Sequence, residues 1–408
     1  MRFPLLIALA FGLVVTGFSV RDAHAIRLGP LQVHPYIDFS VYHDDNVFVT
    51  DKNRVNDRYF LVQPGFLFQL QQRDNQFELE YKADIYRYVH TGTMTVGGQT
   101  SVVNDVEDHF LRGAVYLNFP AGLSVKLDDL ATRGHEARGS QNFATSGTLN
   151  QYWSNSLGAG VSYKLSDRFN VAVDYSNYYM NYKLSANDFR DRVENGVSGQ
   201  VYYKVMPKTS VVLQGIYKNI YHFNNEAGAT AQTLNSNEYW VMAGVTWDIT
   251  AKSTGTVKVG YEWKEFEYPG REGFAKPIYQ VALEHHFTPK TSITVTGARM
   301  ASETDATDAA YYTTTGGSIM MTFKPIGKLT IKPYASLTNS AYSNVTKSSD
   351  GDANRRNDNM WAWGLDASYD MNKWLAVGLG YTHTTRTSTL PVYDYTDNSM
   401  MLRVKALL

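Results

Sequence analysis

The stretch Gln76-Phe77-Glu78-Leu79-Glu80-Tyr81-Lys82-Ala83-Asp84-Ile85 has an apolar residue at every odd position and a charged residue at every even position from 78 to 84. The stretch Val257-Lys258-Val259-Gly260-Tyr261-Glu262-Trp263-Lys264 repeats this scheme. Successive side chains of a β-strand point to opposite faces, so a period of two indicates strands whose faces meet two different environments. The alternating stretches run for roughly 10 to 14 residues, which exceeds the usual strand of a soluble sandwich and suffices for a tilted strand to cross a bilayer. The pattern therefore favours a membrane-spanning sheet.

Short connectors rich in turn-forming residues join these stretches in pairs. They are Arg73-Asp74-Asn75, Pro120-Ala121-Gly122, Ser166-Asp167-Arg168, Met206-Pro207-Lys208-Thr209, 250–254, Thr288-Pro289-Lys290, Pro325-Ile326-Gly327-Lys328 and Met371-Asn372-Lys373. The stretches 204–211 and 286–293 have similar sequences, so the repeating unit is a hairpin. Longer polar segments lie between the hairpins, at 43–56, 91–105, 133–149, 224–236, 302–310 and 343–357. We expect the short connectors to be periplasmic turns and the long segments to be extracellular loops.

These turns and loops separate about 18 strands, an even number that places both chain ends in the periplasm. Their expected spans are 32–42, 58–71, 76–88, 107–119, 123–132, 150–164, 169–182, 193–205, 209–222, 237–249, 255–266, 276–287, 291–300, 311–324, 329–342, 358–370, 373–386 and 396–408. The last span has apolar residues at every second position up to Leu408, like the terminal strand that the barrel-assembly machinery recognises. We therefore predict an all-β fold, a transmembrane antiparallel up-and-down β-barrel.

Residues 1–25 have the layout of a secretory signal peptide. Arg2 is followed by an apolar run over 5–15, and Ala23-His24-Ala25 forms a small-residue cleavage site. The apolar run is shorter than the about 20 residues that a transmembrane helix needs. We expect a signal peptide over 1–25 and an outer-membrane β-barrel over 26–408, exported through the periplasm to the cell outer membrane.

The composition excludes several classes of function. Removing residues 1–25 takes the formal net charge from −1 to −2, a near-neutral balance that argues against a nucleic-acid partner. The chain has no cysteine, which excludes disulfides, thiolate metal sites and cysteine nucleophiles. The 29 Tyr, 19 Phe and 7 Trp make the chain 13% aromatic, as expected of a transmembrane barrel.

The cost of placing a charge in hydrocarbon decides which face of each strand meets lipid. An Arg or Lys at the bilayer midplane costs about 2–4 kcal/mol. The apolar face then meets lipid, with an aromatic girdle beside the short turns at Trp247, Phe287, Phe323, Tyr369 and Trp374. The polar face lines a lumen with Glu78, Glu80, Lys82, Asp84, Arg112, Lys126, Asp128, Asp174, Lys204, Lys258, Glu262, Lys264, Glu284, Asp366, Arg403 and Lys405. Both signs are mixed, so we expect little charge selectivity.

A barrel of 16–18 strands leaves an aqueous channel unless something fills it. The third extracellular loop carries Arg133, His135, Glu136 and Arg138, and it either folds inward as a constriction or remains a solvated surface loop. The inward-facing tyrosines Tyr36, Tyr116, Tyr202 and Tyr334 either stack against passing sugar rings or bond to neighbouring charges.

Catalytic, cofactor and metal sites are not expected. Asp350-Gly351-Asp352-Ala353-Asn354 begins like a calcium loop, but Arg355 stands at the position of the required glycine. His285 and His286 are adjacent in a strand and point to opposite faces. The sequence contains no nucleophile elbow, phosphate loop or zinc-protease motif, and an outer-membrane hydrolase is the least favoured class.

Two regions carry a family resemblance. The first comprises Pro35-Tyr36-Ile37-Asp38, Asp44-Asp45-Asn46-Val47-Phe48 and Gln63-Pro64-Gly65, and the second is 239–255, running into Val259-Gly260-Tyr261. Both resemble the putative beta-barrel porin type 2 family. That resemblance implies an outer-membrane protein of a Gram-negative bacterium, and for some members a role beside exopolysaccharide synthesis and export. It implies no catalytic residues.

We therefore expect a porin-like channel, not an enzyme, for hydrophilic solutes or an exported polysaccharide. The alternative is a structural or adhesive barrel without an open pore. The expected partners are outer-membrane lipid and lipopolysaccharide, the barrel-assembly machinery and, through the resemblance, polysaccharide-export components.

Overall fold

The structure is a computed structural model that describes residues 26–90, 92–96, 99–140, 149–224, 234–250, 252–304, 309–343 and 355–407. The predicted signal peptide and the calcium-like segment 350–354 lie outside these residues. No helix within the described ranges is long and apolar enough to cross a bilayer.

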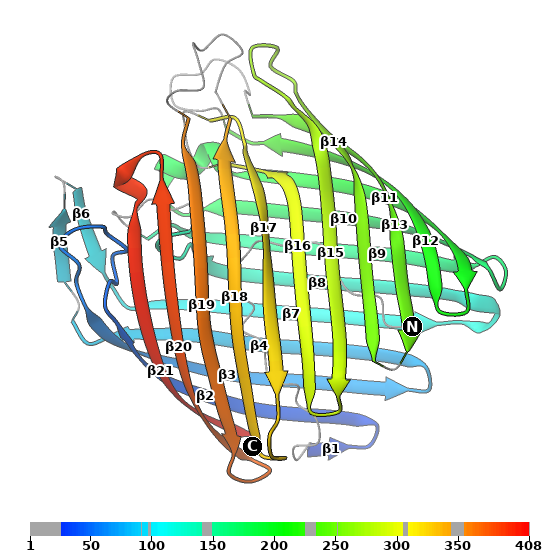
Figure 1. Cartoon of the computed structure of the whole chain (residues 1–408), viewed down its shortest axis with the longest axis horizontal. Helices are drawn as coiled ribbons and strands as arrows, with labels where there is room; N and C mark the ends of the chain where they lie inside the picture. The colour runs from blue at the N-terminus through cyan, green and yellow to red at the C-terminus, as the bar shows by residue number, and fades with distance from the viewer. Residues whose placement is uncertain are drawn as a thin grey trace.

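Within those ranges, 18 antiparallel strands form one closed barrel (Figure 1). Each strand pairs with the next along the chain, and β2 pairs with β21 from Tyr36–Leu407 to Asp44–Ser399 to close the sheet. The barrel strands are β2 (Leu31–Asp44), β3 (Asp57–Gln72), β4 (Asn75–Tyr88), β7 (Val106–Asn118), β8 (Leu123–His135), β9 (Gln151–Lys164), β10 (Phe169–Tyr182), β11 (Arg192–Met206), β12 (Thr209–His222), β13 (Ser236–Thr250), β14 (Ser253–Phe266), β15 (Phe274–Thr288), β16 (Thr291–Ser302), β17 (Tyr312–Phe323), β18 (Leu329–Tyr342), β19 (Asn357–Asp370), β20 (Leu375–Ser388) and β21 (Tyr395–Leu407). The prediction of an antiparallel up-and-down barrel of about 18 strands is confirmed.

Two smaller strand pairings accompany the barrel. The three-residue strand β1 (Ile26–Leu28) pairs with the start of β2, on the edge that β21 uses further along. The hairpin β5 (Gly92–Val96) and β6 (Gln99–Val103) forms a separate sheet and stands beside the wall in Figure 1. This hairpin occupies the segment that the sequence predicts as a loop over 91–105.

Three of the short turns share a local geometry. Register shifts lie between Lys204 and Met206, between Asp248 and Thr250, and between His286 and Thr288. Each is a β-bulge beside a tight turn, where one extra residue increases the twist and ends the pairing. The similar sequences of 204–211 and 286–293 therefore form the same bulged turn.

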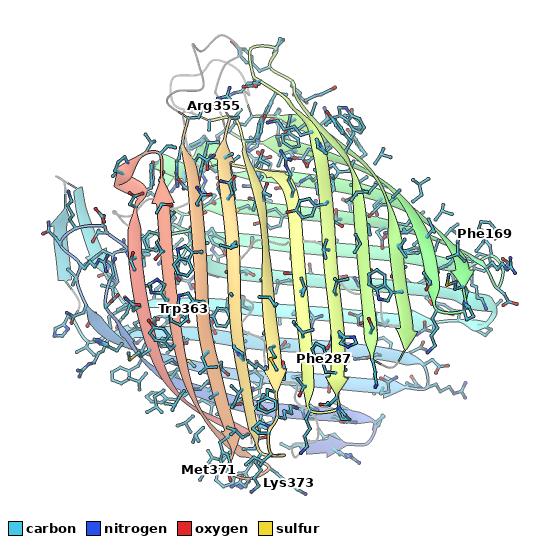
Figure 2. All side chains as sticks on the ribbon, in the orientation of Figure 1. Phe169, Phe287, Arg355, Trp363, Met371 and Lys373 are labelled. Carbon is cyan, nitrogen blue, oxygen red and sulfur yellow. The ribbon has the colours of Figure 1, made fainter. Side chains whose placement is uncertain are left out.

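The two ends of the barrel differ in the length of their connections. Figure 2 labels Met371 and Lys373 at the end with short turns and Arg355 at the end with long loops. By the rule for outer-membrane barrels, we call these the periplasmic and extracellular ends. The exposed girdle residues Phe287, Phe323, Tyr369 and Trp374 lie beside the short turns, as the sequence predicts.

The strands alternate between an exposed apolar face and a polar face. Leu79, Val259 and Leu379 are exposed on the first face, whereas Asp84, Lys258 and Arg403 are buried on the second. The hydrophobic residues thus cover the outside of the barrel, and the polar residues converge inside it.

Candidate functional site: the lumen and its extracellular mouth

The inner wall is identified by bonds between strands that are not neighbours. The Tyr36 hydroxyl of β2 donates to Glu80 Oε1 of β4 at 2.9 Å, and its ring lies over Gly65 of β3. A Cβ at Gly65 would come within 2.2 Å of that ring, so only glycine allows this approach. A sheet closed into a barrel brings side chains together in this way only on its concave face. The polar face therefore lines the lumen.

The same arrangement recurs at Tyr334, whose hydroxyl lies 2.7 Å from Thr382 Oγ1 across Gly364. The Tyr202 hydroxyl donates to Gln200 Oε1, while Tyr116 is half-buried opposite Lys126. Three of the four predicted lumen tyrosines thus bond to neighbouring side chains.

Charged residues predicted for the lumen form ion pairs along the wall. The pairs are Lys82–Asp84 at 3.0 Å, Lys126–Asp128 at 2.8 Å, Arg403–Asp366 at 2.9 Å and Arg112–Glu78 at 3.9 Å. The Lys82 and Lys126 side chains are 33% and 34% exposed, so these pairs remain accessible to solvent in the lumen. Each pair presents both signs at one place.

The other predicted lumen residues lie on the same wall with separate partners. Asp174 accepts a hydrogen bond from Gln200, Lys258 donates to Gln214, Lys405 lies over the Tyr36 ring, and Glu284 pairs with His286. Lys204 is half-buried near the periplasmic end of β11.

A denser ion-pair network occupies the wall at β11–β14. Its pairs are Arg192–Glu194 at 2.8 Å, Lys218–Glu194 at 3.3 Å, Lys218–Glu238 at 2.7 Å, Lys264–Glu238 at 2.9 Å and Lys264–Glu303. Lys264 has an exposed fraction of 0% and Glu238 of 1%. Of this network, only Lys264 was predicted for the lumen. The same alternation of apolar and polar residues places Arg192, Glu194, Lys218 and Glu238 on the inner face as well.

Three described residues between β16 and β17, Glu303, Ala310 and Tyr311, lie inside the lumen beside this network. Glu303 belongs to the predicted loop 302–310, yet its carboxylate contacts Lys264. The buried Glu262 carboxylate accepts a hydrogen bond from the Ala301 amide at 3.1 Å. Next to it, an apolar cluster fills the space inside the wall with Met242, Phe274, Ile278, Ala301, Ala310 and Tyr311. Burial raises the pKa of Tyr311, in the loop before β17, to about 12. This side of the lumen therefore holds packed side chains.

Residues 141–148 of the predicted constriction loop lie outside the described residues, and the four residues named for it fall into two stretches. Arg133 and His135 belong to β8, which extends to His135. The Arg133 guanidinium lies 5.9 Å from the ring of exposed Trp153 on the outer face. Including Arg133 in a constriction is therefore wrong, because the alternation of β8 continues through this residue and turns it outward. His135 Nδ1 lies 2.9 Å from Asp108 Oδ1 at the end of the strand.

The second part, residues 136–140, crosses the mouth of the barrel. Arg386 Nη1 on β20 donates to the carbonyls of Gly139 and Ser140, each at 3.1 Å. The Tyr395 hydroxyl on β21 also donates to Gly139 O, at 3.2 Å. Around the wall, β8 is separated from β20 by β7, β4, β3, β2 and β21. The loop thus forms a chord from one side of the mouth to the other.

Side chains of the chord are also anchored. Glu136 pairs with Arg190 and accepts a hydrogen bond from the Tyr182 hydroxyl at 2.7 Å. Arg138 lies 5.2 Å from the Phe48 ring, and burial lowers the pKa of Arg138. The chord is fixed at its start, along its length and at its far side.

Acidic residues gather at one further place. Among the described residues, one group, Asp44, Asp45 and Asp397, places carboxylate oxygens within 4.8 Å of one another. Asn398 donates to both oxygens of Asp45, and the Asn46 amide donates to Asp44. These bonds already satisfy two of the carboxylates, and no metal site is assigned.

The family model described as Putative beta-barrel porin 2 matches residues 21–407. No curated protein matches the chain. The solved outer membrane protein opdK from Pseudomonas aeruginosa is similar at 7% identity and a TM-score of 0.45, covering 92% of this chain and 99% of that chain. A BenF-like porin from Pseudomonas fluorescens Pf-5 is similar at 8% identity and a TM-score of 0.46, with the same coverage of 92% and 99%. The siderophore receptor PirA from Acinetobacter baumannii is similar at 8% identity and a TM-score of 0.45, covering 92% of this chain and 80% of that chain.

Proposed function

The chain belongs to the Putative beta-barrel porin 2 family, and from this premise we propose that the outer-membrane barrel is a passive channel for small hydrophilic solutes. The solvent-accessible ion pairs of the inner wall, Lys82–Asp84 and Lys126–Asp128, support this proposal. A wall of paired Lys, Arg, Asp and Glu side chains is costly in a dry core and favourable beside water. A barrel of this strand number is also wide enough to hold water. The mixed signs support passage of neutral solutes and of ions of either charge.

We propose that the chord over 136–140 limits the size of the solute. It crosses the mouth between β8 and β20, while Glu303, Ala310 and Tyr311 pack against the inner face of β13–β15. Together they restrict the open path to the remaining part of the lumen. This geometry favours small solutes over a polysaccharide chain, whose export would require the chord to move.

The structural or adhesive barrel remains the second candidate. The apolar cluster around Met242 and Phe274 supports it, because packed side chains inside a lumen strengthen the barrel without aiding transport. We also propose contacts with outer-membrane lipid and lipopolysaccharide, and with the barrel-assembly machinery during insertion.

Solute passage distinguishes the two candidates. Vesicles containing the folded protein are expected to swell in isotonic glucose and sucrose, and to swell more slowly as the sugar is lengthened. The rate of swelling is followed by light scattering against empty vesicles. Protein-containing vesicles that swell no faster than empty ones in glucose would support the structural barrel and contradict the channel.

Arg386→Met tests the chord. The substitution removes the donors to Gly139 and Ser140, so the chord is expected to loosen and the swelling rate in larger sugars to rise several-fold. Arg356→Met is the matched control, because Arg356 is another buried arginine of the mouth and also lies over the Tyr393 ring, but its charge pairs with Asp358, whereas Arg386 donates to Gly139 and Ser140. Equal swelling rates for Arg386→Met and Arg356→Met, in all sugars, would show that the chord does not limit passage.

A further inference from the structure

A cluster of one tyrosine and two asparagines occurs twice on the outer face of the barrel. On β10 and β11, Tyr175 Oη and Asn177 Nδ2 donate to Asn195 Oδ1 at 2.8 and 2.9 Å. On β12 and β13, Tyr217 Oη and Asn219 Nδ2 donate to Asn237 Oδ1 at 2.9 and 3.0 Å. The second cluster repeats the first, one hairpin further along the wall.

The two clusters are joined into one surface. Asn177 lies opposite Asn195, Asn195 opposite Asn219, and Asn219 opposite Asn237, so four neighbouring strands carry a continuous row of amides. Exposed aromatic rings border this row, at Tyr175, Tyr179, Tyr217, Tyr221, Phe223 and Tyr239. Tyr217 and Tyr239 have ring centroids 5.3 Å apart, and Tyr179 and Phe223 5.9 Å apart. We call these rings and the four asparagines the amide–aromatic patch.

The patch lies where the hydrocarbon layer ends. Asparagine is depleted from strands, and an amide facing hydrocarbon without a full set of hydrogen bonds costs free energy. Asn195 and Asn237 lie close to the extracellular starts of β11 and β13, whereas Val201 and Val245 occupy the same outer face further down. Tyrosine rings are also enriched at the headgroup level. The patch therefore faces the headgroups of the outer leaflet.

The chemistry of the patch selects the kind of headgroup. The carbonyls of Asn195 and Asn237 already accept two bonds each, which leaves their amide nitrogens as donors at the surface. The ten members carry no charge, whereas phosphate recognition relies on Arg and Lys. Neutral amides beside aromatic planes suit a sugar, whose hydroxyls accept hydrogen bonds and whose C–H face packs on a ring. We propose that the amide–aromatic patch binds the sugar headgroup of a glycolipid in the outer leaflet.

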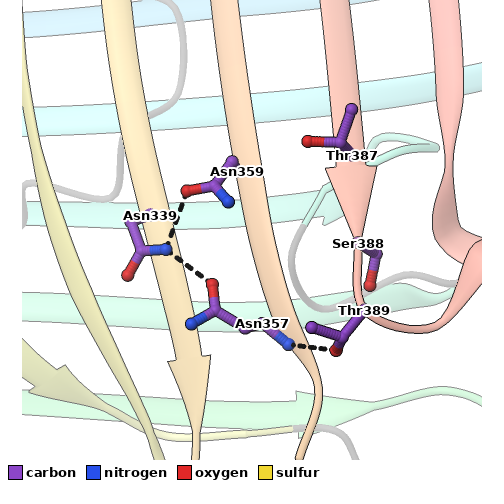
Figure 3. A pocket seen from close by; sticks show the side chains of 6 residues that line it. All are labelled: Asn339, Asn357, Asn359, Thr387, Ser388 and Thr389. Carbon is purple, nitrogen blue, oxygen red and sulfur yellow. Dashed lines mark hydrogen bonds between the residues drawn. The ribbon is translucent and has the colours of Figure 1, made fainter.

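A second outward group of amides has the same character. Asn339 on β18 donates to Asn357 and Asn359 on β19, at 2.6 and 2.9 Å (Figure 3). With Thr387 they line an open hollow of about 430 Å³. Exposed Leu337 and Trp361 lie next along the same face. Outward amides above apolar residues thus recur on another part of the wall.

The test compares two double variants of the full barrel in vesicles of defined lipid. Asn195→Leu with Asn237→Leu removes the amides, while Val197→Leu with Val241→Leu alters the same outer face and keeps them. The vesicles contain phosphatidylcholine alone, phosphatidylcholine with diglucosyl diacylglycerol, or phosphatidylcholine with phosphatidic acid. The temperature of unfolding is read from the shift in gel mobility on heating.

We expect the glucosyl lipid to raise the unfolding temperature of the wild type and the valine variant, and the asparagine variant to lose most of that increment. In phosphatidylcholine alone the three proteins should unfold at similar temperatures, so a folding defect is separated from a lost contact. An increment that survives in the asparagine variant, or that phosphatidic acid reproduces in the wild type, would overturn the proposal. So would dimers of the wild type that the asparagine variant abolishes, because the patch would then bind a second copy. None of these results depends on whether the lumen conducts, so the glycolipid proposal and the channel proposal are tested separately.

Discussion

Replacing Lys264 by Met is expected to destabilise the folded barrel by about 3–5 kcal/mol, the usual cost of removing one partner from a buried ion pair. Lys264 has an exposed fraction of 0% and contacts the carboxylates of Glu238 and Glu303. Without the ammonium, both carboxylates lose a buried partner at the place where the segment after β16 joins the wall. Urea unfolding in detergent, followed by tryptophan fluorescence, measures the change.

Lys126→Met is the matched control. Lys126 is also an ion-paired lysine of the lumen, at 2.8 Å from Asp128, but its side chain is 34% exposed. A solvent-exposed pair contributes at most about 1 kcal/mol. If the two variants lost equal stability, the burial of the network around Lys264 would have no energetic consequence, contrary to this interpretation.

Replacing Leu379 by Arg is expected to cost about 2–4 kcal/mol, because the guanidinium would enter the hydrocarbon layer. Leu379 is 62% exposed on the outer face of β20, between Ala367 and Leu402 of the neighbouring strands. The yield of heat-modifiable barrel after folding into vesicles, and its resistance to urea, measure the loss.

Leu130→Arg makes the same chemical change on the other face. Leu130 is 38% exposed in the lumen, opposite Arg112 and Ser156. Its guanidinium would meet water, and repulsion from Arg112 should cost about 1 kcal/mol or less. Stronger damage from Leu130→Arg than from Leu379→Arg would reverse the assignment of the two faces.

The barrel could be predicted because each strand separates two environments. That requirement imposes a period of two where a strand crosses the hydrocarbon layer, as in 76–85, and the short turns carry their own residue signals. The hairpin β5–β6 was missed because it lies outside the barrel wall, where no lipid face enforces the period. Arg133 was misplaced for a related reason. Its charge suggested a loop, whereas β8 continues past it and the guanidinium lies over Trp153.

The mouth of the lumen could be predicted only in part. The charges of the lumen could be predicted from the face of each strand on which they lie, and charges on one face of the same or nearby strands lie close enough to pair. The chord could not be predicted in detail, because Arg386 binds the backbone carbonyls of Gly139 and Ser140, and backbone carbonyls have no sequence signature. The inward position of Glu303 could not be predicted, because the sequence of a polar loop does not distinguish a solvated glutamate from one that contacts the buried Lys264. Only the fold brings these two residues together.

Current through single inserted barrels in a planar bilayer tests the channel most directly. Folded, heat-modifiable protein is expected to give discrete current steps that grow with salt concentration. The reversal potential in a salt gradient should lie near zero, because the lining mixes Lys and Arg with Asp and Glu. Folded protein that inserts and yet passes no current would contradict the channel.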